Sequence, residues 1–202
     1  MTEAPMNTDE NQLSASRKST ARLLCVIAAL CILIPCVGLD WLTAPKRYGD
    51  FGMNLLSVDR CGEDFDGHQR CESHSNFEVA KQMREAKAGQ GTFAYAALAT
   101  LILTVAAGAA IGAAGGLAFK DRFVRKPVAL TTVAMLALFL SLVAACVFIG
   151  SKPTELPLSV SWPFFLYAVG VVLGIAGAQM LSKAFSAPAD PYWDGIAPEP
   201  PA

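Results

Sequence analysis

The stretch from Phe93 to Phe119 reads FAYAALATLILTVAAGAAIGAAGGLAF and contains no Asp, Glu, Lys, Arg or His. A helix of this length can cross the hydrocarbon core of a bilayer, which is about 30 Å thick and takes about 20 apolar residues. A surface helix of a soluble protein would carry a stripe of charged and polar residues, which is missing here. This stretch therefore predicts a membrane-spanning helix.

Three further stretches have the same character and also lack ionisable residues, namely Leu23–Leu39, Val128–Gly150 and Pro163–Leu181. Over the whole chain 53% of residues are hydrophobic and 16% are charged, with a mean hydropathy of +0.42, which is unusual for a soluble domain. We therefore expect an all-α membrane protein, a four-transmembrane-helix bundle with a small extracytoplasmic loop domain.

Charge placement predicts the orientation of this bundle. Residues 120–126 read KDRFVRK, and Arg17, Lys18 and Arg22 precede the first span. Dense Lys and Arg beside a span favour the cytoplasmic side. We expect a multi-pass protein of the plasma (inner) membrane with both termini cytoplasmic. The expected segments are a disordered tail at 1–22, spans at 23–44, 93–119, 128–150 and 163–182, an outer loop domain at 45–92, a cytoplasmic loop at 120–127, a short outer loop at 151–162 and a Pro-rich tail at 183–202.

The expected outer loop is long enough to have a small fold of its own. Ser75 and Glu78 have the spacing of a capping box, which predicts a helix over 76–88. Residues 48–60 fit either short strands or irregular structure. Trp41 follows the first span, where a tryptophan suits the headgroup layer.

Cys61 and Cys71 are the only cysteines of the expected outer loop, and a disulfide between them is the simplest interpretation. The alternative adds His68 and His74, because two thiolates and two imidazoles are ligands that zinc accepts. Glu63, Asp64 and Asp66 lie between the two cysteines without the spacing of a calcium loop, so a solvated acidic turn is expected. The remaining cysteines, Cys25, Cys31, Cys36 and Cys146, lie in the spans and are expected to act as small apolar side chains.

Catalysis at membrane depth is not expected. Proton relays and ion pathways place ionisable groups inside spans, whereas the polar groups here are amide and hydroxyl side chains such as Thr100, Thr104, Thr131, Thr132, Ser141 and Gln179. The chain shows no nucleophile motif, phosphate loop or cofactor site, and it identifies no small-molecule substrate. A net charge of −1 gives no reason to expect a nucleic-acid partner.

Small residues recur every four positions in two spans, as Gly108, Gly112 and Gly116 and as Gly170, Gly174 and Ala178. Residues four apart share a helix face, and small side chains let two helices approach closely in a membrane. These faces are expected to be packing seams. The spacing leaves open whether a seam lies inside the bundle, which we favour, or joins two copies of the chain.

The layout resembles the claudin and peripheral myelin protein superfamily. The residues that carry the resemblance are Trp41 after the first span, the stretch Tyr48–Leu55 before Cys61, Cys71 ten positions later, Gln82 with Arg84 before the second span, and Trp162–Gly177. The family's Gly-Leu-Trp before its first cysteine is replaced here by Gly52, Met53 and Asn54, and the scaffold-binding carboxy terminus of many claudins is missing.

This resemblance implies a left-handed four-helix bundle with a small extracellular sheet pinned by a disulfide. It also implies a non-enzymatic role in adhesion, in a barrier or as an accessory subunit. The expected partners are the lipid bilayer and, through residues 45–92, another membrane protein or further copies of the chain. Two other functions remain open: an extracytoplasmic metal-binding or sensing protein that uses His68 and His74, and a transporter or channel subunit.

Overall fold

The computed structural model describes residues 8–45, 50–63, 68–86, 91–119, 127–153 and 158–185. These residues form, in chain order, α1 (Thr8–Leu33), the 3-10 helix η1 (Ile34–Cys36), β1 (Leu42–Thr43), β2 (Asp50–Met53), β3 (Ser57–Glu63), β4 (Gln69–Ser75), α2 (Asn76–Glu85), α3 (Thr92–Phe119), α4 (Pro127–Gly150), β5 (Ser159–Val160) and α5 (Trp162–Phe185).

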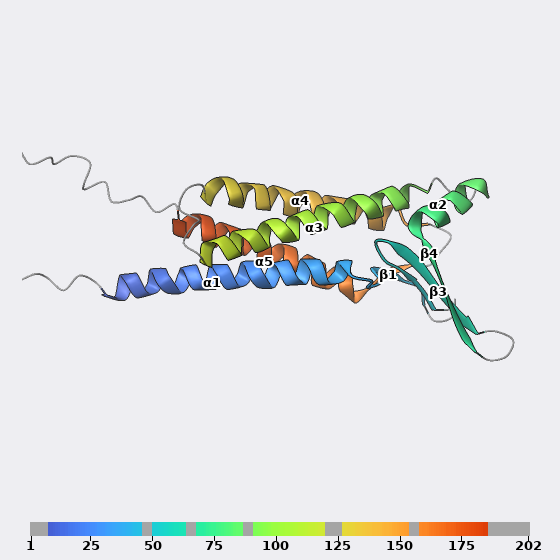
Figure 1. Ribbon diagram of the computed structural model, residues 1–202, viewed down its shortest axis with the longest axis horizontal. Coiled ribbons are helices and arrows are strands. Elements are labelled where there is room, and N and C mark those ends of the chain that lie inside the picture. The colour runs from blue at the N-terminus through green and yellow to red at the C-terminus, as the bar shows by residue number, and fades with distance from the viewer. Residues whose placement is uncertain are drawn as a thin grey trace, which may run out of the picture.

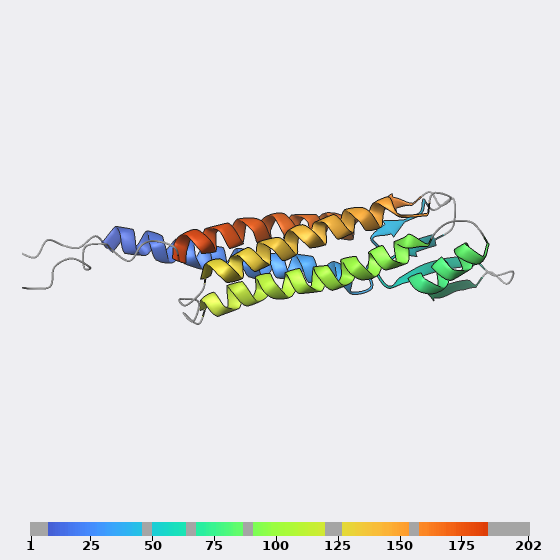
Figure 2. The same ribbon diagram turned by 90° about the horizontal axis from the view of Figure 1, so that it is seen from above.

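Four long helices, α1, α3, α4 and α5, lie side by side as an elongated bundle, and the strands gather at one end of it (Figures 1 and 2). Each contains a segment long and apolar enough to cross a membrane: Ser16–Cys36, Thr92–Ala118, Ala129–Gly150 and Trp162–Ala184. The chain is therefore an integral membrane protein with the expected four-helix fold.

The outward faces of the bundle are as apolar as its interior. Phe139 of α4 and Val172 of α5, for example, are 61% and 67% exposed. Such side chains would be costly against water, whereas lipid tails are as apolar as they are. The interior differs from the outward faces in being rich in alanine and glycine. These small residues allow close contact between helices, which holds the bundle together more than bulky side chains do.

Helix α1 packs between α3 and α5, and both small-residue seams face it. A Cβ atom added at Gly108 of α3 would lie 2.7 Å from the Leu33 side chain. One added at Gly170 of α5 would lie 2.9 Å from Cys31 Cβ. The seams are therefore internal to the bundle, which is the arrangement that we favoured.

Further along the seams, one of the expected positions was wrong. A Cβ atom added at Gly112 would lie 3.5 Å from Ala29 Cβ. Gly174 lies between Leu138 and Ala28, and Ala178 is fully buried. Gly116, however, is exposed and faces open space, and Gly115 contacts α1 in its place. A strict four-residue repeat advances by more than one full turn at each step, so the contact moves to a three-residue step.

The first helix differs from the expected boundaries at both ends. Residues 8–22, expected to be disordered, continue the helix, because extending a formed helix costs far less than nucleating one. The helix ends at Leu33 and not at 44. Pro35 lacks a backbone N–H and lies in η1, and Gly38 then takes a φ of +65°, which turns the chain into β1.

The strands form one antiparallel sheet in the order β4-β3-β2-β1-β5. Residues expected to be strands or irregular structure are therefore strands in β2 and in the first half of β3. Strand β5 comes from the connection between α4 and α5 and pairs with β1 through Leu42 and Val160. We call this sheet together with α2 the sheet domain.

Helix α2 begins as its capping signal predicts. Ser75 is the N-cap residue, and its Oγ accepts a hydrogen bond from the Glu78 backbone N–H at 3.2 Å. The Glu78 carboxylate does not complete the box but lies 3.6 Å from His74 Nδ1. The helix ends at Glu85, and the last part of the expected 76–88 segment lies outside the described residues.

Trp41 joins the sheet domain to the bundle. Its side chain is fully buried, against the expectation that it anchors in the headgroup layer. The indole Nε1–H donates to the Pro35 carbonyl at 2.9 Å, and the ring lies 5.1 Å from that of Tyr167. Its backbone N–H bonds to Met53, and its carbonyl accepts from Ser161. The bend at Pro35 and Gly38 directs this ring inward.

Candidate interaction site on the sheet domain

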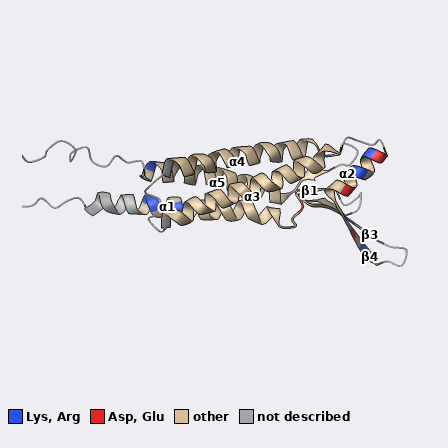
Figure 3. Cartoon of the chain, turned by 45° about the horizontal axis from the view of Figure 1, so that its top comes forward, with Lys and Arg blue, Asp and Glu red and all other residues tan. Residues whose placement is uncertain are grey.

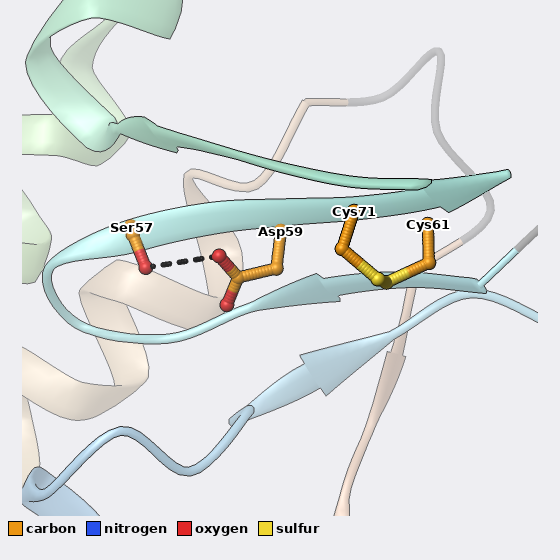
Figure 4. The surroundings of a disulfide bond; sticks show 4 residues. All are labelled: Ser57, Asp59, Cys61 and Cys71. Atoms are coloured by element: carbon orange, nitrogen blue, oxygen red, sulfur yellow. Dashed lines mark hydrogen bonds between the residues drawn. A yellow bond between two sulfur atoms is a disulfide. The ribbon is translucent and has the colours of Figure 1, made fainter. Parts of the chain in front are cut away.

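A disulfide pins the two longest strands. Cys61 of β3 and Cys71 of β4 lie directly opposite each other in the antiparallel register and are bonded, as Figure 4 shows. The link closes a short loop in a domain with little core of its own, and in the chain-entropy model such a link stabilises the folded state by about 2 to 3 kcal/mol. The predicted disulfide is present.

The alternative metal site is not assembled in the structure. The Cys61 and Cys71 thiols are both used in the disulfide, and His68 is exposed directly before β4. His74 lies 3.6 Å from Glu78 and 3.9 Å from Glu72, both exposed carboxylates. Among the residues whose placement is described, no group of three His, Cys, Asp or Glu side chains is placed to hold a metal. This statement does not cover the acidic turn, because Asp64, Asp66 and the Glu63 side chain lie outside the described residues.

The β3–β4 strand pair has two different faces. On one, Val58 is buried and joins a core with Leu42, Met53 and Ala80 of α2. Toward the far tip of the pair this face becomes charged, with Arg60 directly opposite Glu72. Such opposite-charge cross-strand pairs favour the register. The apolar half seats the sheet on the bundle and leaves the charged half exposed.

The other face carries the disulfide. Figure 4 shows Ser57, Asp59 and the disulfide on this side of the strand pair, with the Ser57 hydroxyl bonded to the Asp59 carboxylate at 3.4 Å. A hollow of about 280 Å³ opens here. Its described lining consists of Asp40, Thr43, Ala44, Asp50, Phe51, Gly52, Asp59 and Cys61. The hollow is thus lined by three carboxylates from three segments of the chain.

Asp40 is the most constrained of these carboxylates. Asp40 follows the first span, and its side chain lies against Gly52 of β2. A Cβ atom on Gly52 would overlap the Asp40 carboxylate. Its Oδ1 atom is buried and has no hydrogen-bond partner among the described residues. Burial raises the pKa of the Asp40 carboxyl, and the nearby charge of Asp59 raises it further. An ionised Asp40 therefore destabilises the junction between bundle and sheet.

The sign of this effect sets a pH dependence. A raised pKa means that the folded protein binds a proton more tightly than the unfolded chain, so stability falls as pH rises from the ordinary value of 3.8 through the raised value. We expect Asp40→Asn to remove this loss and to raise the thermal midpoint at pH 7. At pH 4 the gain should shrink. Melting curves in detergent between these pH values measure the difference, and an equal or lower midpoint for Asp40→Asn at pH 7 would refute this view of Asp40.

The polar groups inside the spans serve packing. The hydroxyls of Ser141 on α4 and Tyr167 on α5 are 2.8 Å apart and buried. Thr100 bonds back to the Ala96 carbonyl of its own helix. The Ser141–Tyr167 bond ties α4 to α5, as hydroxyls do in membrane interiors.

The free cysteines match their expected apolar role in part. Cys25 is buried against Gly177, and Cys31 faces Gly170, so both fill helix contacts. The Cys36 thiol lies 3.6 Å from the Ile32 carbonyl. Cys146 is exposed on the outward face of α4.

Sequence reasoning missed Asp40 and Asn54 as parts of the site. The Asn54 side-chain oxygen Oδ1 accepts hydrogen bonds from the backbone N–H groups of Leu56 and Ser57 at 2.8 and 2.7 Å, which builds the β2–β3 turn. The Asn-Leu-Leu-Ser run at 54–57 is a signal for such a turn. Asp40 gave no local signal, because its partners Gly52 and Asp59 come from distant strands.

No protein-family model matches the chain, and no curated protein matches it in sequence.

Proposed function

We propose that this chain is a non-enzymatic membrane protein whose sheet domain is an interaction surface for another membrane protein or for further copies of the chain. A disulfide pins the sheet, and the buried Trp41 side chain seats the sheet on the bundle. Such a platform holds a surface of fixed shape at the membrane. Pre-organised surfaces bind at a lower entropic cost than flexible loops.

The geometry of β4 supports this role. It is an edge strand of the sheet, pairing with β3 on one side only. Arg70, Glu72 and Ser73 on it are exposed. A charged edge resists indiscriminate strand pairing, so a partner must match its pattern of side chains. The acid-lined hollow on the adjacent disulfide face favours a partner that presents a basic side chain.

We place the sheet domain outside the cytoplasm of the plasma membrane, with both termini inside. Two described features support this orientation. The disulfide is stable in an oxidising compartment. Arg17, Lys18 and Arg22 on α1 and Lys183 in the last turn of α5 lie at the end of the bundle opposite the sheet, where Figure 3 shows a group of blue residues. Positive residues beside spans favour the cytoplasmic side. The basic segment 120–126 lies outside the described residues.

We also propose that the chain is related to the claudin and peripheral myelin protein superfamily. The resemblance implied a four-helix bundle with a small sheet pinned by a disulfide, and the fold has these parts. The resemblance supports a role in adhesion, in a barrier or as an accessory subunit.

Site-specific photo-crosslinking in intact cells tests the interaction. A photoreactive amino acid at Glu72, on the exposed edge, is expected to capture a discrete protein, which mass spectrometry then identifies as a partner or as a second copy. The same residue at Val143, on the outward face of α4, is the matched control for contacts within the membrane. If positions 60, 70 and 72 all give no protein adduct that the control lacks, the sheet is not the interaction surface.

A further inference from the structure

An exposed apolar patch lies where the sheet domain meets the bundle. It consists of Leu56 in the β2–β3 turn, Phe77 in the first turn of α2 and Tyr95 in the first turn of α3, which are 56%, 42% and 58% exposed. The rings of Phe77 and Tyr95 pack edge to face with centroids 5.4 Å apart. The Leu56 carbonyl accepts a hydrogen bond from Asn76, the neighbour of Phe77. We call these three residues the Phe77 patch.

The patch continues a surface that already faces lipid. Exposed residues follow one face of α3 at three- and four-residue intervals, from Val105 through Ile102 and Leu98 to Tyr95. Residues at these intervals form a single stripe along a helix. The stripe has no charged residue, and at its end the patch extends it from α3 onto α2.

The level of the patch follows from helix geometry. Gly108 of α3 and Gly170 of α5 both face α1, at Leu33 and Ile32, so they lie at similar depth. Tyr95 precedes Gly108 by thirteen residues and Trp162 precedes Gly170 by eight. The difference is five residues. At about 1.5 Å per residue, Tyr95 lies about 8 Å farther toward the sheet domain than Trp162, the first residue of α5. The headgroup layer is about 5 to 8 Å thick on each side of the hydrocarbon core.

The direction of α2 turns Phe77 toward the bilayer. A Cβ atom added at Gly91 would touch Ala80, and Phe77 meets Tyr95, so α2 runs antiparallel to the start of α3 and away from the bundle. Figure 1 shows α2 extending past this end of α3. Side chains in a helix lean toward its N-terminus. The Phe77 ring therefore leans toward the membrane, while Glu78 is turned to His74.

We propose that the Phe77 patch is a membrane-contact site that inserts into the phospholipid headgroup layer and fixes the sheet domain against the bilayer. Aromatic side chains are favoured at this layer. Continuity with the lipid-facing stripe of α3 is what distinguishes lipid from a protein partner here. The sheet domain is then held at two places. Trp41 fixes it to the helix bundle, and Phe77 fixes it to the headgroup layer.

The test uses the full chain in phosphatidylcholine vesicles. Cys25, Cys31, Cys36 and Cys146 are replaced by alanine, the disulfide is kept, and an environment-sensitive fluorophore is attached to Phe77→Cys. Gln82→Cys is the matched control, because Gln82 is exposed on the other flank of the same helix. We expect a lipid with a nitroxide on its headgroup to quench the label at 77 severalfold more than the label at 82. Equal quenching at the two positions overturns the proposal.

A second outcome would also overturn it. If the label at 77 is shielded both from the lipid nitroxide and from aqueous iodide, a second copy or another protein covers the patch. Photoactivatable lipid provides a test that needs no substitution in the chain. With the reactive group near the headgroup, and after reduction of the disulfide that links the two peptides, adducts are expected in the tryptic peptide 71–81, which contains Phe77, and not in the peptide 61–70 of the same domain. The absence of adducts from 71–81 would equally contradict the proposal.

Discussion

Replacing Trp41 with alanine is expected to destabilise the protein by about 3 to 5 kcal/mol, the usual cost of removing a buried tryptophan. The indole fills the junction between bundle and sheet, with ring centroids 6.3 Å from Phe148, 6.0 Å from Phe164 and 5.1 Å from Tyr167. The substitution leaves a cavity there and removes the bond to Pro35. Unfolding in detergent, followed by circular dichroism with increasing denaturant, measures the change.

Trp162→Ala is the matched control for Trp41→Ala. Trp162 begins α5 near the same end of the bundle, but its side chain is 58% exposed. Trp162→Ala should therefore lower the free energy of unfolding in detergent much less than Trp41→Ala does. Equal losses for the two variants would mean that Trp41 does not hold the junction.

A leucine at position 170 is expected to lower the thermal midpoint by roughly 2 to 12 °C. A Cβ atom alone would come within 2.9 Å of Cys31 Cβ and 3.0 Å of the Ile32 backbone nitrogen, and neither atom can move aside by a change of side-chain rotamer. Helices α1 and α5 must separate. Over-packing of this kind costs about 1 to 3 kcal/mol, and 1 kcal/mol shifts the midpoint of a chain of this size by about 2 to 4 °C.

Gly116→Leu is the control for Gly170→Leu, because a Cβ atom at Gly116 meets nothing within 4 Å. It makes the same chemical change on the outward face of α3. We expect its midpoint to remain near that of the natural protein. If both variants melt alike, the seam between α1 and α5 is not closely packed.

The sequence predicted the features that depend on local composition. Uninterrupted apolar stretches define the four spans whatever their partners, and Ser75 caps α2 through its own backbone neighbours. The disulfide was also predictable, because Cys61 and Cys71 are the only cysteines between the first two spans. Each of these signals lies within a short segment of the chain.

The features that escaped prediction are set by distant contacts. Strands β1 and β5 have two residues each, too few for any periodicity, and form by pairing residues more than a hundred positions apart. Trp41 is buried because a bend at Pro35 and Gly38 redirects the chain. The contact of Asp40 with Gly52 likewise depends on how the sheet folds back over the end of the first span.

We propose that a disulfide-pinned sheet domain stands on the four-helix bundle outside the cytoplasm. Peptide mass spectrometry tests it most directly, on protein taken from its native membrane with free thiols alkylated at lysis and no reductant present. We expect a linked pair of peptides that joins Cys61 to Cys71, with Cys25, Cys31, Cys36 and Cys146 unlinked. Recovery of Cys61 and Cys71 as two alkylated thiols would contradict both the pinned sheet and its place in an oxidising compartment.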